Sequence, residues 1–169
     1  MILKDSSKKW IAIYTKPKHE QSVAAALLQK TYEVYLPLLK KRRKWSDRKK
    51  WVEFPLFKSY LFVKTRLNNT IPISKTPGVV KIIKFGGKIA LVDNQSIKSI
   101  KKMIDGGYNP EPTDYFITGD QVEVRDGPLK GMVGEVARID NHDRLIIRID
   151  SIQHSISVKI NRGYLKRIK

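Results

Sequence analysis

The last third of the chain consists of short runs of β-branched residues separated by turn residues. Strand-like runs cover residues 121–125, 132–139, 145–149 and 155–160, and turns recur every eight to twelve residues. Valine and isoleucine favour strands and lower helix propensity. The turn residues Gly127, Pro128, Gly131 and Gly134 would each interrupt a helix, proline at a cost of about 3 kcal/mol in a helix interior. This pattern predicts a small all-β barrel.

The preceding residues predict a mixed α+β domain with the element order β-α-β-β-β-β-α. An apolar run at residues 10–14 predicts a strand, and the helical spacing that follows up to Thr31 begins with Pro17 and Glu20, which suit a helix start. Residues 34–36, 58–64, 79–83 and 89–92 predict further strands, the second and third of these as neighbours in one sheet. A final helix follows Asp93 and stops at two glycines.

Charge and composition divide the chain in two. Residues 105–118 hold two glycines and two prolines without periodicity, so we expect a domain at 1–105, a linker at 106–117 and a barrel at 118–169. The net charge is +18, of which residues 114–169 contribute only +2, from ten basic and eight acidic side chains. A strongly basic first part indicates a polyanionic partner such as nucleic acid.

The basic charge is densest between Lys40 and Lys50, which we expect to form a hairpin or loop. This segment carries eight positive side chains and one negative one, with Trp45 inside it and Trp51 just after it. Phosphate contact and base stacking are therefore chemically available. A solvated hairpin tip that aids solubility is the alternative. The candidate nucleic-acid ligands here are Lys40, Lys41, Arg42, Arg43, Lys44, Arg48, Lys49 and Lys50.

Several classes of function are disfavoured. The chain has no cysteine and three histidines, and no acid pair is placed by a recognisable motif, so we expect no enzyme, no metal site and no cofactor. His142 and His154 are expected to be exposed polar residues. No apolar run approaches the ~18 to 20 residues that span a bilayer, and residues 1–9 form a short polar stretch without the apolar segment of a signal peptide. This predicts a cytoplasmic protein without membrane contact.

Two segments resemble the signatures of the NusG family of transcription factors. Residues 55–63 resemble the aromatic segment before a central strand of that family's N-terminal domain, and Lys16-Pro17-Lys18-His19-Glu20, Leu36-Pro37 and Pro77-Gly78-Val79 follow in the same order. Residues 119–122 with 127–136 are similar to its KOW motif, including Gly127, Pro128, Gly131 and Gly134. The resemblance implies an NGN-type α/β sandwich, an antiparallel sheet with helices, followed by an SH3-like KOW β-barrel.

The resemblance also implies a function. Members bind the clamp helices of RNA polymerase through an apolar patch, suppress pausing and termination, and use the barrel to recruit Rho or a small-subunit ribosomal protein. The positions that match the patch are Tyr14, Phe57, Tyr60, Phe62, Phe85 and Ile97. On a strand, Tyr60 and Phe62 point to the same face, so part of the aromatic set is either core or a partner surface.

Two departures refine the expectation. Residues 56–62 are closer to the specialised paralogues RfaH and the UpxY group, which implies a dedicated antiterminator, and Lys16, Lys18 and His19 match the region that such members use to read DNA. The segment 40–50 is more basic than the family pattern, which suggests contact with DNA or nascent RNA. We expect a monomer whose barrel is constitutive rather than fold-switching. A KOW-containing RNA-binding or ribosome-associated protein is the alternative.

Overall fold

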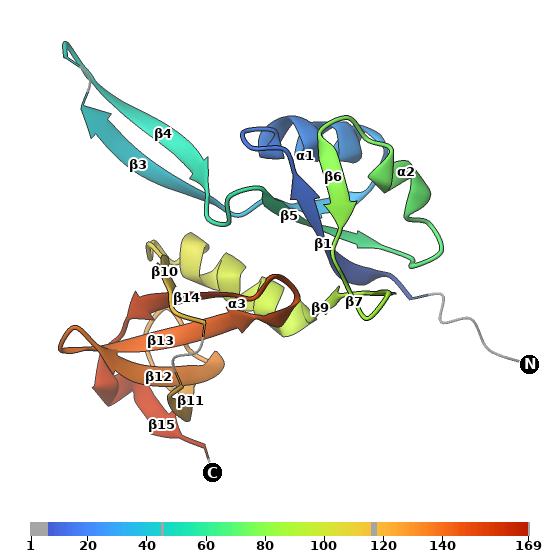
Figure 1. Cartoon of the computed structure of the whole chain (residues 1–169). Coiled ribbons are helices and arrows are strands. Elements are labelled where there is room, and N and C mark those ends of the chain that lie inside the picture. The colour runs from blue at the N-terminus through green and yellow to red at the C-terminus, as the bar shows by residue number, and fades with distance from the viewer. Residues whose placement is uncertain (1–6, 45, 116–117, 169) are drawn as a thin grey trace, which may run out of the picture. The chain divides into compact units, whose positions relative to one another are not determined.

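The chain forms two compact units, residues 1–93 and 94–169 (Figure 1). The computed structural model describes residues 7–44, 46–115 and 118–168. Trp45, part of the predicted basic segment, lies outside the described residues. Among the described helices, none combines the length and apolar character needed to cross a membrane.

The first unit is built on a five-stranded antiparallel sheet. Its strands are β1 (Lys9–Thr15), β2 (Glu33–Tyr35), β5 (Tyr60–Thr65), β6 (Val79–Ile82) and β9 (Leu91–Val92). The order is β2-β5-β1-β6, and β9 also pairs with β1. The expectation that residues 58–64 and 79–83 are neighbouring strands is wrong, because β1 lies between β5 and β6. Local patterns identify strands but carry no information on which distant strand forms the hydrogen bonds.

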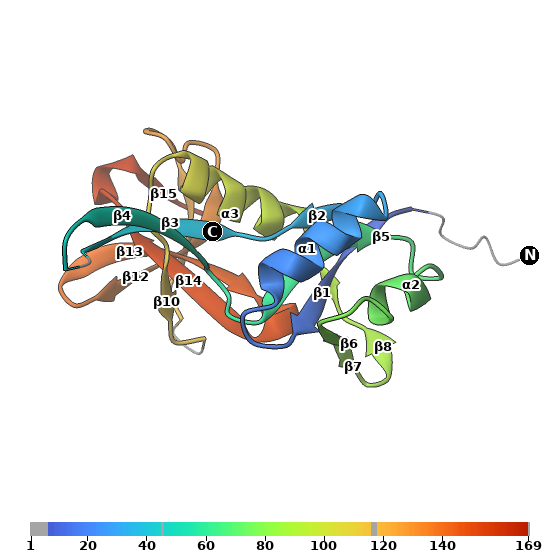
Figure 2. The same ribbon diagram turned by 90° about the horizontal axis from the view of Figure 1, so that it is seen from above.

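One face of this sheet packs against two helices, α1 (Glu20–Gln29) and α2 (Ile71–Ser74) (Figure 2). The buried core contains Ile11, Ile13, Leu61 and Val63 from the alternate positions of β1 and β5, and Val23, Ala24, Leu27 and Ile73 from the helices. Burying a side chain of this size contributes about 1.5–3 kcal/mol, so these positions hold the unit together. Helix α1 ends before Thr31, as predicted, and the φ of 65° at Thr31 cannot continue a helix. The short α2 was not expected.

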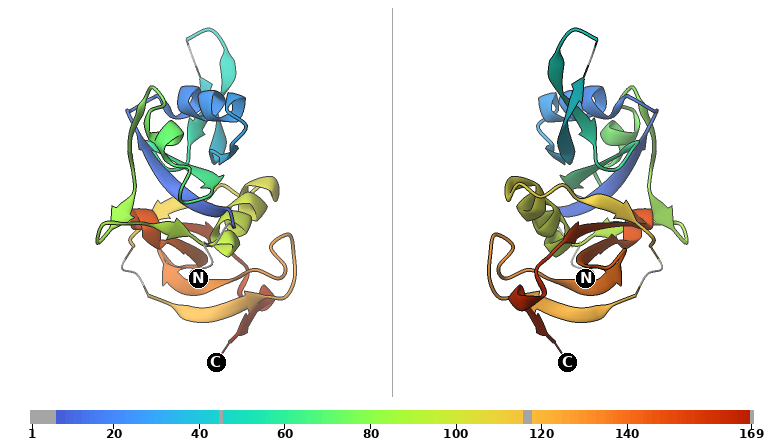
Figure 3. Two further views of the ribbon diagram at one scale, coloured as in Figure 1. Left: turned by 90° about the vertical axis from the view of Figure 1, so that its right-hand side faces the viewer. Right: turned by 90° about the vertical axis from the view of Figure 1, so that its left-hand side faces the viewer.

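Two hairpins extend from the first unit. The long one pairs β3 (Leu38–Lys44) with β4 (Lys49–Pro55), and both views of Figure 3 show it projecting beyond α1. The basic segment therefore forms a hairpin, one of the two conformations expected. The short one pairs β7 (Lys84–Phe85) with β8 (Lys88–Ile89) around Gly86 and Gly87, whose positive φ angles of 54° and 77° suit a tight hairpin turn.

The second unit contains the predicted antiparallel barrel, a six-stranded sheet of order β10-β14-β13-β12-β11-β15. Its strands and 3-10 turns are β10 (Glu111–Thr113), β11 (Asp120–Val124), β12 (Val133–Ile139), β13 (His142–Ile149), η1 (Asp150–Ile152), β14 (His154–Lys159), η2 (Arg162–Tyr164) and β15 (Leu165–Arg167). In β11 the buried residues Val122 and Val124 alternate with more exposed ones. The buried apolar residues of the next strands are Leu145, Ile146, Ile147 and Ile149 of β13 and Ile156 and Val158 of β14. Consecutive residues of β13 and β14 are buried, so both faces of these two strands are covered, which suits the continuous apolar run at residues 145–147 of β13.

Helix α3 (Asn94–Asp105) groups with the barrel, whereas the sequence placed it in the first domain. Its apolar stripe of Ile97, Ile100 and Met103 is buried, and Ser96 Oγ donates to the Arg148 carbonyl of β13 at 3.5 Å. An amphipathic pattern predicts that one helix face is covered but not which element covers it. The helix itself and its end before Gly106 are as predicted.

The segment 106–117, expected to be an unstructured linker, contains strand β10. Residues Glu111–Thr113 pair with Ser155–Ser157 of β14. The buried guanidinium of Arg144 donates to Oε2 of Glu111 at 2.7 Å and to Oγ of Ser157 at 2.8 Å. A short strand with a proline at its centre, Pro112, lacks the apolar alternation on which a strand prediction depends. This part of the segment is therefore tied to the barrel edge.

Candidate functional site

The sheet face opposite α1 carries a set of aromatic side chains, which we call the aromatic face: Tyr14, Tyr35, Tyr60 and Phe62. Tyr14 of β1 is directly opposite Tyr60 of β5, with ring centroids 5.2 Å apart. The ring of Phe62 stacks with that of Tyr35 of β2, with centroids 6.4 Å apart, and forms a T-shaped pair with Phe57 at 5.9 Å. The same-face placement of Tyr60 and Phe62 follows from strand alternation, since Leu61 and Val63 point into the helix-covered core.

The loop that leads into β5 is held by a buried carboxylate. Glu20, at the first turn of α1 and 6% exposed, accepts a hydrogen bond from the Ser59 backbone N–H at 2.7 Å. Ser59 has a φ of 64°, and its carbonyl accepts from the Thr15 N–H at 2.8 Å. These contacts fix the bend after which Tyr60 enters the sheet. Glu20 was predicted only as a complement to the helix dipole, because a hydrogen bond between residues 39 positions apart leaves no local sequence signal.

The aromatic face differs in exposure along its length. Tyr14 and Tyr60 are half-buried, whereas Phe57 and Phe62 are buried. Lys81 Nζ lies 5.8 Å from the Tyr14 ring centroid, which places a cation beside the tyrosine pair. Burial, and secondarily the neighbouring Tyr14, raise the pKa of the Tyr60 hydroxyl above its ordinary value. Tyr60 is therefore a neutral hydrogen-bonding group at neutral pH, at the accessible end of the face.

The structure brings together four of the six residues that match the family's polymerase-binding patch: Tyr14, Phe57, Tyr60 and Phe62. Phe85 lies on the separate β7–β8 hairpin and is 51% exposed. Ile97 lies on α3 in the second unit, where it is buried. The sheet geometry thus supports one coherent candidate surface, centred on Tyr14 and Tyr60.

A second candidate surface is the β3–β4 hairpin, whose described basic residues are all exposed. They alternate between two faces: Lys40, Arg42, Lys44 and Lys49 lie on one, with Lys41, Arg43 and Lys50 on the other, while Arg48 is in the turn. The acidic residue Glu53 accepts one ion pair, from Lys40 at 3.5 Å. The hairpin therefore keeps a strong positive charge on both faces.

The segment between β1 and α1 holds the other predicted nucleic-acid ligands, Lys16, Lys18 and His19, all exposed. The Lys16 N–H donates to the Gly78 carbonyl at 2.9 Å, and Nδ1 of His19 lies 2.9 Å from the Pro17 carbonyl. Gly78 has a φ of 91°, and a Cβ there would meet Val23 Cγ2 at 2.8 Å. The close approach of Gly78 to Lys16 and to Val23 of α1 explains the glycine at this position, because a side chain there would clash.

Sequence reasoning missed Gln21, which helps to line a hollow beside the hairpin. This hollow of about 880 Å³ is lined by Gln21, Lys40, Lys50, Trp51, Val52 and Glu53. Gln21 comes from the outer side of α1, where a polar residue has no distinguishing pattern. Trp51 was noted only as a neighbour of the basic segment, although an aromatic residue in a polar strand is a signal that sequence alone provides.

In the second unit, the KOW residues form a turn that the barrel holds closely. Gly127 and Gly131 have φ angles of 77° and 84°, and Leu129 and Met132 between and beside them are buried. A Cβ at Gly127 would lie 3.0 Å from the Tyr164 ring. The pattern of this motif is thus explained by turn geometry and packing, as expected for a structural signature.

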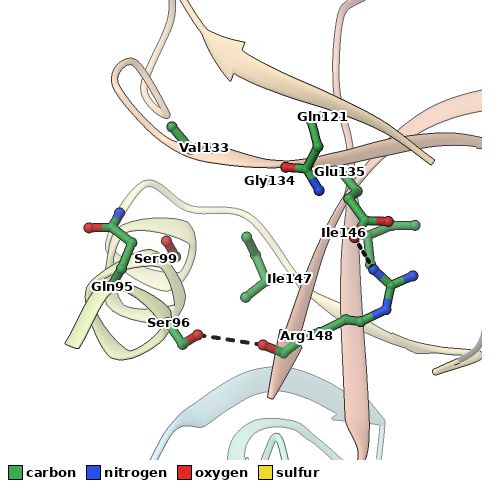
Figure 4. A pocket seen from close by; sticks show the side chains of 10 residues that line it. All are labelled: Gln95, Ser96, Ser99, Gln121, Val133, Gly134, Glu135, Ile146, Ile147 and Arg148. Atoms are coloured by element: carbon green, nitrogen blue, oxygen red, sulfur yellow. Dashed lines mark hydrogen bonds and ion pairs between the residues drawn. The ribbon is translucent and has the colours of Figure 1, made fainter. Parts of the chain in front are cut away.

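A smaller pocket of about 150 Å³ lies between α3 and the barrel strands, within the second unit (Figure 4). Arg148 forms an ion pair with Glu135 at its rim, and Ile147 and Ser99 form part of its walls. Within the described ranges, no three His, Cys, Asp or Glu side chains cluster closely enough to hold a metal ion. His142 is exposed, and His154 is half-buried, with Nδ1 2.6 Å from the Ile152 carbonyl.

Comparison with known proteins connects these surfaces to one family. Residues 8–101 match the family described as transcription termination factor NusG, and residues 118–150 match the KOW motif. The first match includes the five-stranded sheet of the first unit and most of α3. The transcription termination/antitermination protein NusG of Helicobacter pylori is 23% identical over 94% of this chain and 98% of its own length. A solved structure of Thermotoga maritima NusG, which concerns its domain interaction, shares the fold with a TM-score of 0.56 and 20% identity, covering 96% of this chain and 98% of that one.

The predicted fold, a mixed α+β domain followed by a KOW barrel, is therefore confirmed. Because the NusG match covers more than half of the residues, including those that build the aromatic face and the basic hairpin, the chain belongs to the NusG family of transcription factors.

Proposed function

We propose that this protein is a transcription elongation and antitermination factor that binds the clamp helices of RNA polymerase through its aromatic face. The observation that carries the proposal is the in-register Tyr14–Tyr60 pair, half-buried and 5.2 Å apart, on the sheet face opposite α1. Tyrosine is among the residue types enriched at the hot spots of protein interfaces. Docking at this site would favour the closed, processive polymerase and suppress pausing and termination.

Two modules share this function: residues 1–105 and residues 118–169, joined by residues 106–117. This division is supported by separate family matches at 8–101 and 118–150. The first module binds polymerase, and the KOW barrel recruits Rho or a small-subunit ribosomal protein. No bond is made or broken by the protein, which acts in the cytoplasm as a monomer and needs no cofactor.

The basic hairpin supplies the second contact, with DNA or nascent RNA beside the polymerase. Its described cations are exposed, and only Lys40 has a carboxylate within ion-pair distance among the contacts described for the hairpin. Like charges at this density repel each other, so a polyanion nearby would stabilise them. Lys16, Lys18 and His19 extend this role to sequence-specific recruitment, as expected of an RfaH-like or UpxY-like paralogue.

The test is the binding of Tyr60→Ala to isolated clamp helices. Truncating a hot-spot tyrosine costs about 2 kcal/mol or more, so we expect at least about a 30-fold loss of affinity. Leu28→Ala is the matched control, because Leu28 is an exposed apolar residue of α1, 56% exposed, on the opposite side of the sheet. If Tyr60→Ala binds as tightly as the control, the polymerase site lies elsewhere. Copurification with ribosomal subunits instead of polymerase would favour the ribosome-associated alternative.

A further inference from the structure

Trp51 occupies an unusual position for a tryptophan, at the centre of one face of the basic hairpin. It is 64% exposed on β4 and directly opposite Arg42 of β3. The cross-strand pairs Lys40 with Glu53 and Lys44 with Lys49 share this face, because residues two apart on a strand point the same way. Because the Trp51 ring is exposed and its neighbours on this face are charged, the ring gains no stabilisation from burial in the core of the unit.

The opposite face of the hairpin shows what a structural aromatic residue does in this setting. There Phe54 is half-buried beside Leu39, its cross-strand partner, which is buried. Lys41 Nζ lies 5.1 Å from the Phe54 ring centroid and covers it. Phe54 and Leu39 therefore anchor the base of the hairpin, and the anchoring needs no contribution from the exposed indole of Trp51.

Trp51 also helps to line the hollow beside the hairpin. The lining residues combine the aromatic Trp51 with the basic Lys40 on the same face of the hairpin, and Gln21 contributes a polar side chain. An indole offers a flat surface for stacking, ammonium groups attract phosphates, and a glutamine amide both donates and accepts hydrogen bonds at a base edge. These groups match the three chemical parts of a nucleotide.

We propose that Trp51 stacks against an unpaired base of a single-stranded nucleic acid, while the surrounding cations hold its backbone. The inference rests on the proposed nucleic-acid role of the hairpin and names its target. In a duplex, each base face is already covered by its neighbours, so a duplex would engage the cations alone. Only a single strand can use the ring and the charges together.

The experiment measures binding of the full-length protein to a labelled single strand of about 12 nucleotides and to a duplex of the same length, each as DNA and as RNA. Base stacking on an aromatic side chain contributes enough that Trp51→Ala should weaken single-strand binding about 5- to 150-fold. The affinity of Trp51→Ala for the duplex should stay within about twofold of wild type, because no charge is removed. For the same reason, the slope of log affinity against log salt for the single strand should be unchanged. Trp51→Phe, which keeps an aromatic ring, should restore most of the affinity.

The charge variant Arg42→Gln/Arg43→Gln/Lys44→Gln separates this inference from the proposed function. It should weaken binding to single strands and duplexes alike and reduce the salt dependence of both. If Trp51→Ala binds single strands like wild type while the charge variant loses affinity, the stacking inference is wrong and the hairpin's nucleic-acid role stands. Equal losses on single strand and duplex would show that Trp51 only shapes the hairpin.

If the wild-type protein binds none of the four probes in a salt-dependent way, both the stacking inference and the proposed hairpin role fail. A loss confined to the DNA strand or to the RNA strand supports stacking and identifies which single strand the site takes. Circular dichroism of each variant verifies the fold, and an exposed side chain such as Trp51 is not expected to alter it.

Discussion

Replacing Glu20 by alanine tests whether a single buried carboxylate holds the loop that presents Tyr60. Glu20 is 6% exposed, and its Oε1 accepts from the Ser59 N–H at 2.7 Å. A hydrogen bond to a charged group contributes about 1.5–3 kcal/mol, and a carboxylate at a helix N-terminus adds about 0.3–1 kcal/mol. Since the alanine variant also leaves the Ser59 N–H without this acceptor, we expect a decrease of about 2–4 kcal/mol in the free energy of unfolding.

Urea unfolding followed by tryptophan fluorescence measures this decrease in the intact protein. All three tryptophans, Trp10, Trp45 and Trp51, lie within residues 1–93, so the signal reports the first unit. Glu20→Gln keeps a neutral acceptor of the same shape and should be destabilised roughly half as much, because charge-assisted hydrogen bonds are about twice as strong as neutral ones.

Glu33→Ala is the matched control for Glu20→Ala. Glu33 is half-exposed and pairs with Lys64 at 3.6 Å, so its removal should cost no more than about 1 kcal/mol. If the free energies of unfolding of Glu20→Ala and Glu33→Ala differ by less than about 0.5 kcal/mol, the Glu20–Ser59 hydrogen bond does not hold the loop. The order of stability expected is wild type, Glu33→Ala, Glu20→Gln, Glu20→Ala.

Two further predictions concern the hairpin and the barrel. In the hairpin variant Arg42→Gln/Arg43→Gln/Lys44→Gln, the slope of log affinity against log salt should flatten by up to about one unit for each lost phosphate contact. The slope should not change in the control variant of the second unit, Lys159→Gln/Arg162→Gln/Lys166→Gln. An unchanged slope in the hairpin variant would mean that the hairpin only aids solubility. Circular dichroism of residues 113–169 should show a β spectrum, and the full chain should show no more helix than the 26 residues of α1, α2 and α3; a large excess would reveal a fold-switching barrel.

The elements of this protein were largely predictable from local sequence, because their signals are short-range. Short runs of apolar, aromatic and β-branched residues identified β1, β5 and the barrel strands, and the glycines at 106 and 107 marked the end of α3. The neighbours of each element were not predictable in the same way. The position of β1 between β5 and β6, the grouping of α3 with the barrel and the pairing of β10 with β14 all depend on contacts between distant residues.

In the candidate site too, the features set by local sequence were predictable and those set by distant contacts were not. That Tyr60 and Phe62 share a face followed from the two-residue period of a strand, and the charge of the hairpin could be counted. That Phe62 is buried while Tyr60 is half-buried depends on what packs against the sheet, which residue type does not determine. The ion pairs and the Glu20 hydrogen bond likewise required coordinates.

The aromatic face and the basic hairpin are joined by a short segment whose ends are both held. Strand β4 ends at Pro55 and β5 begins at Tyr60, and between them the Leu56 N–H donates to the Pro37 carbonyl at 2.9 Å. At the other end, Ser59 is held by Glu20 and Thr15. A hairpin on a free loop would only raise the local concentration of nucleic acid, as a flexible tether does. A hairpin that is held at its base instead keeps a defined direction relative to the aromatic face. A nucleic-acid strand stacked on Trp51 would therefore lie at a fixed position relative to a polymerase bound at Tyr60.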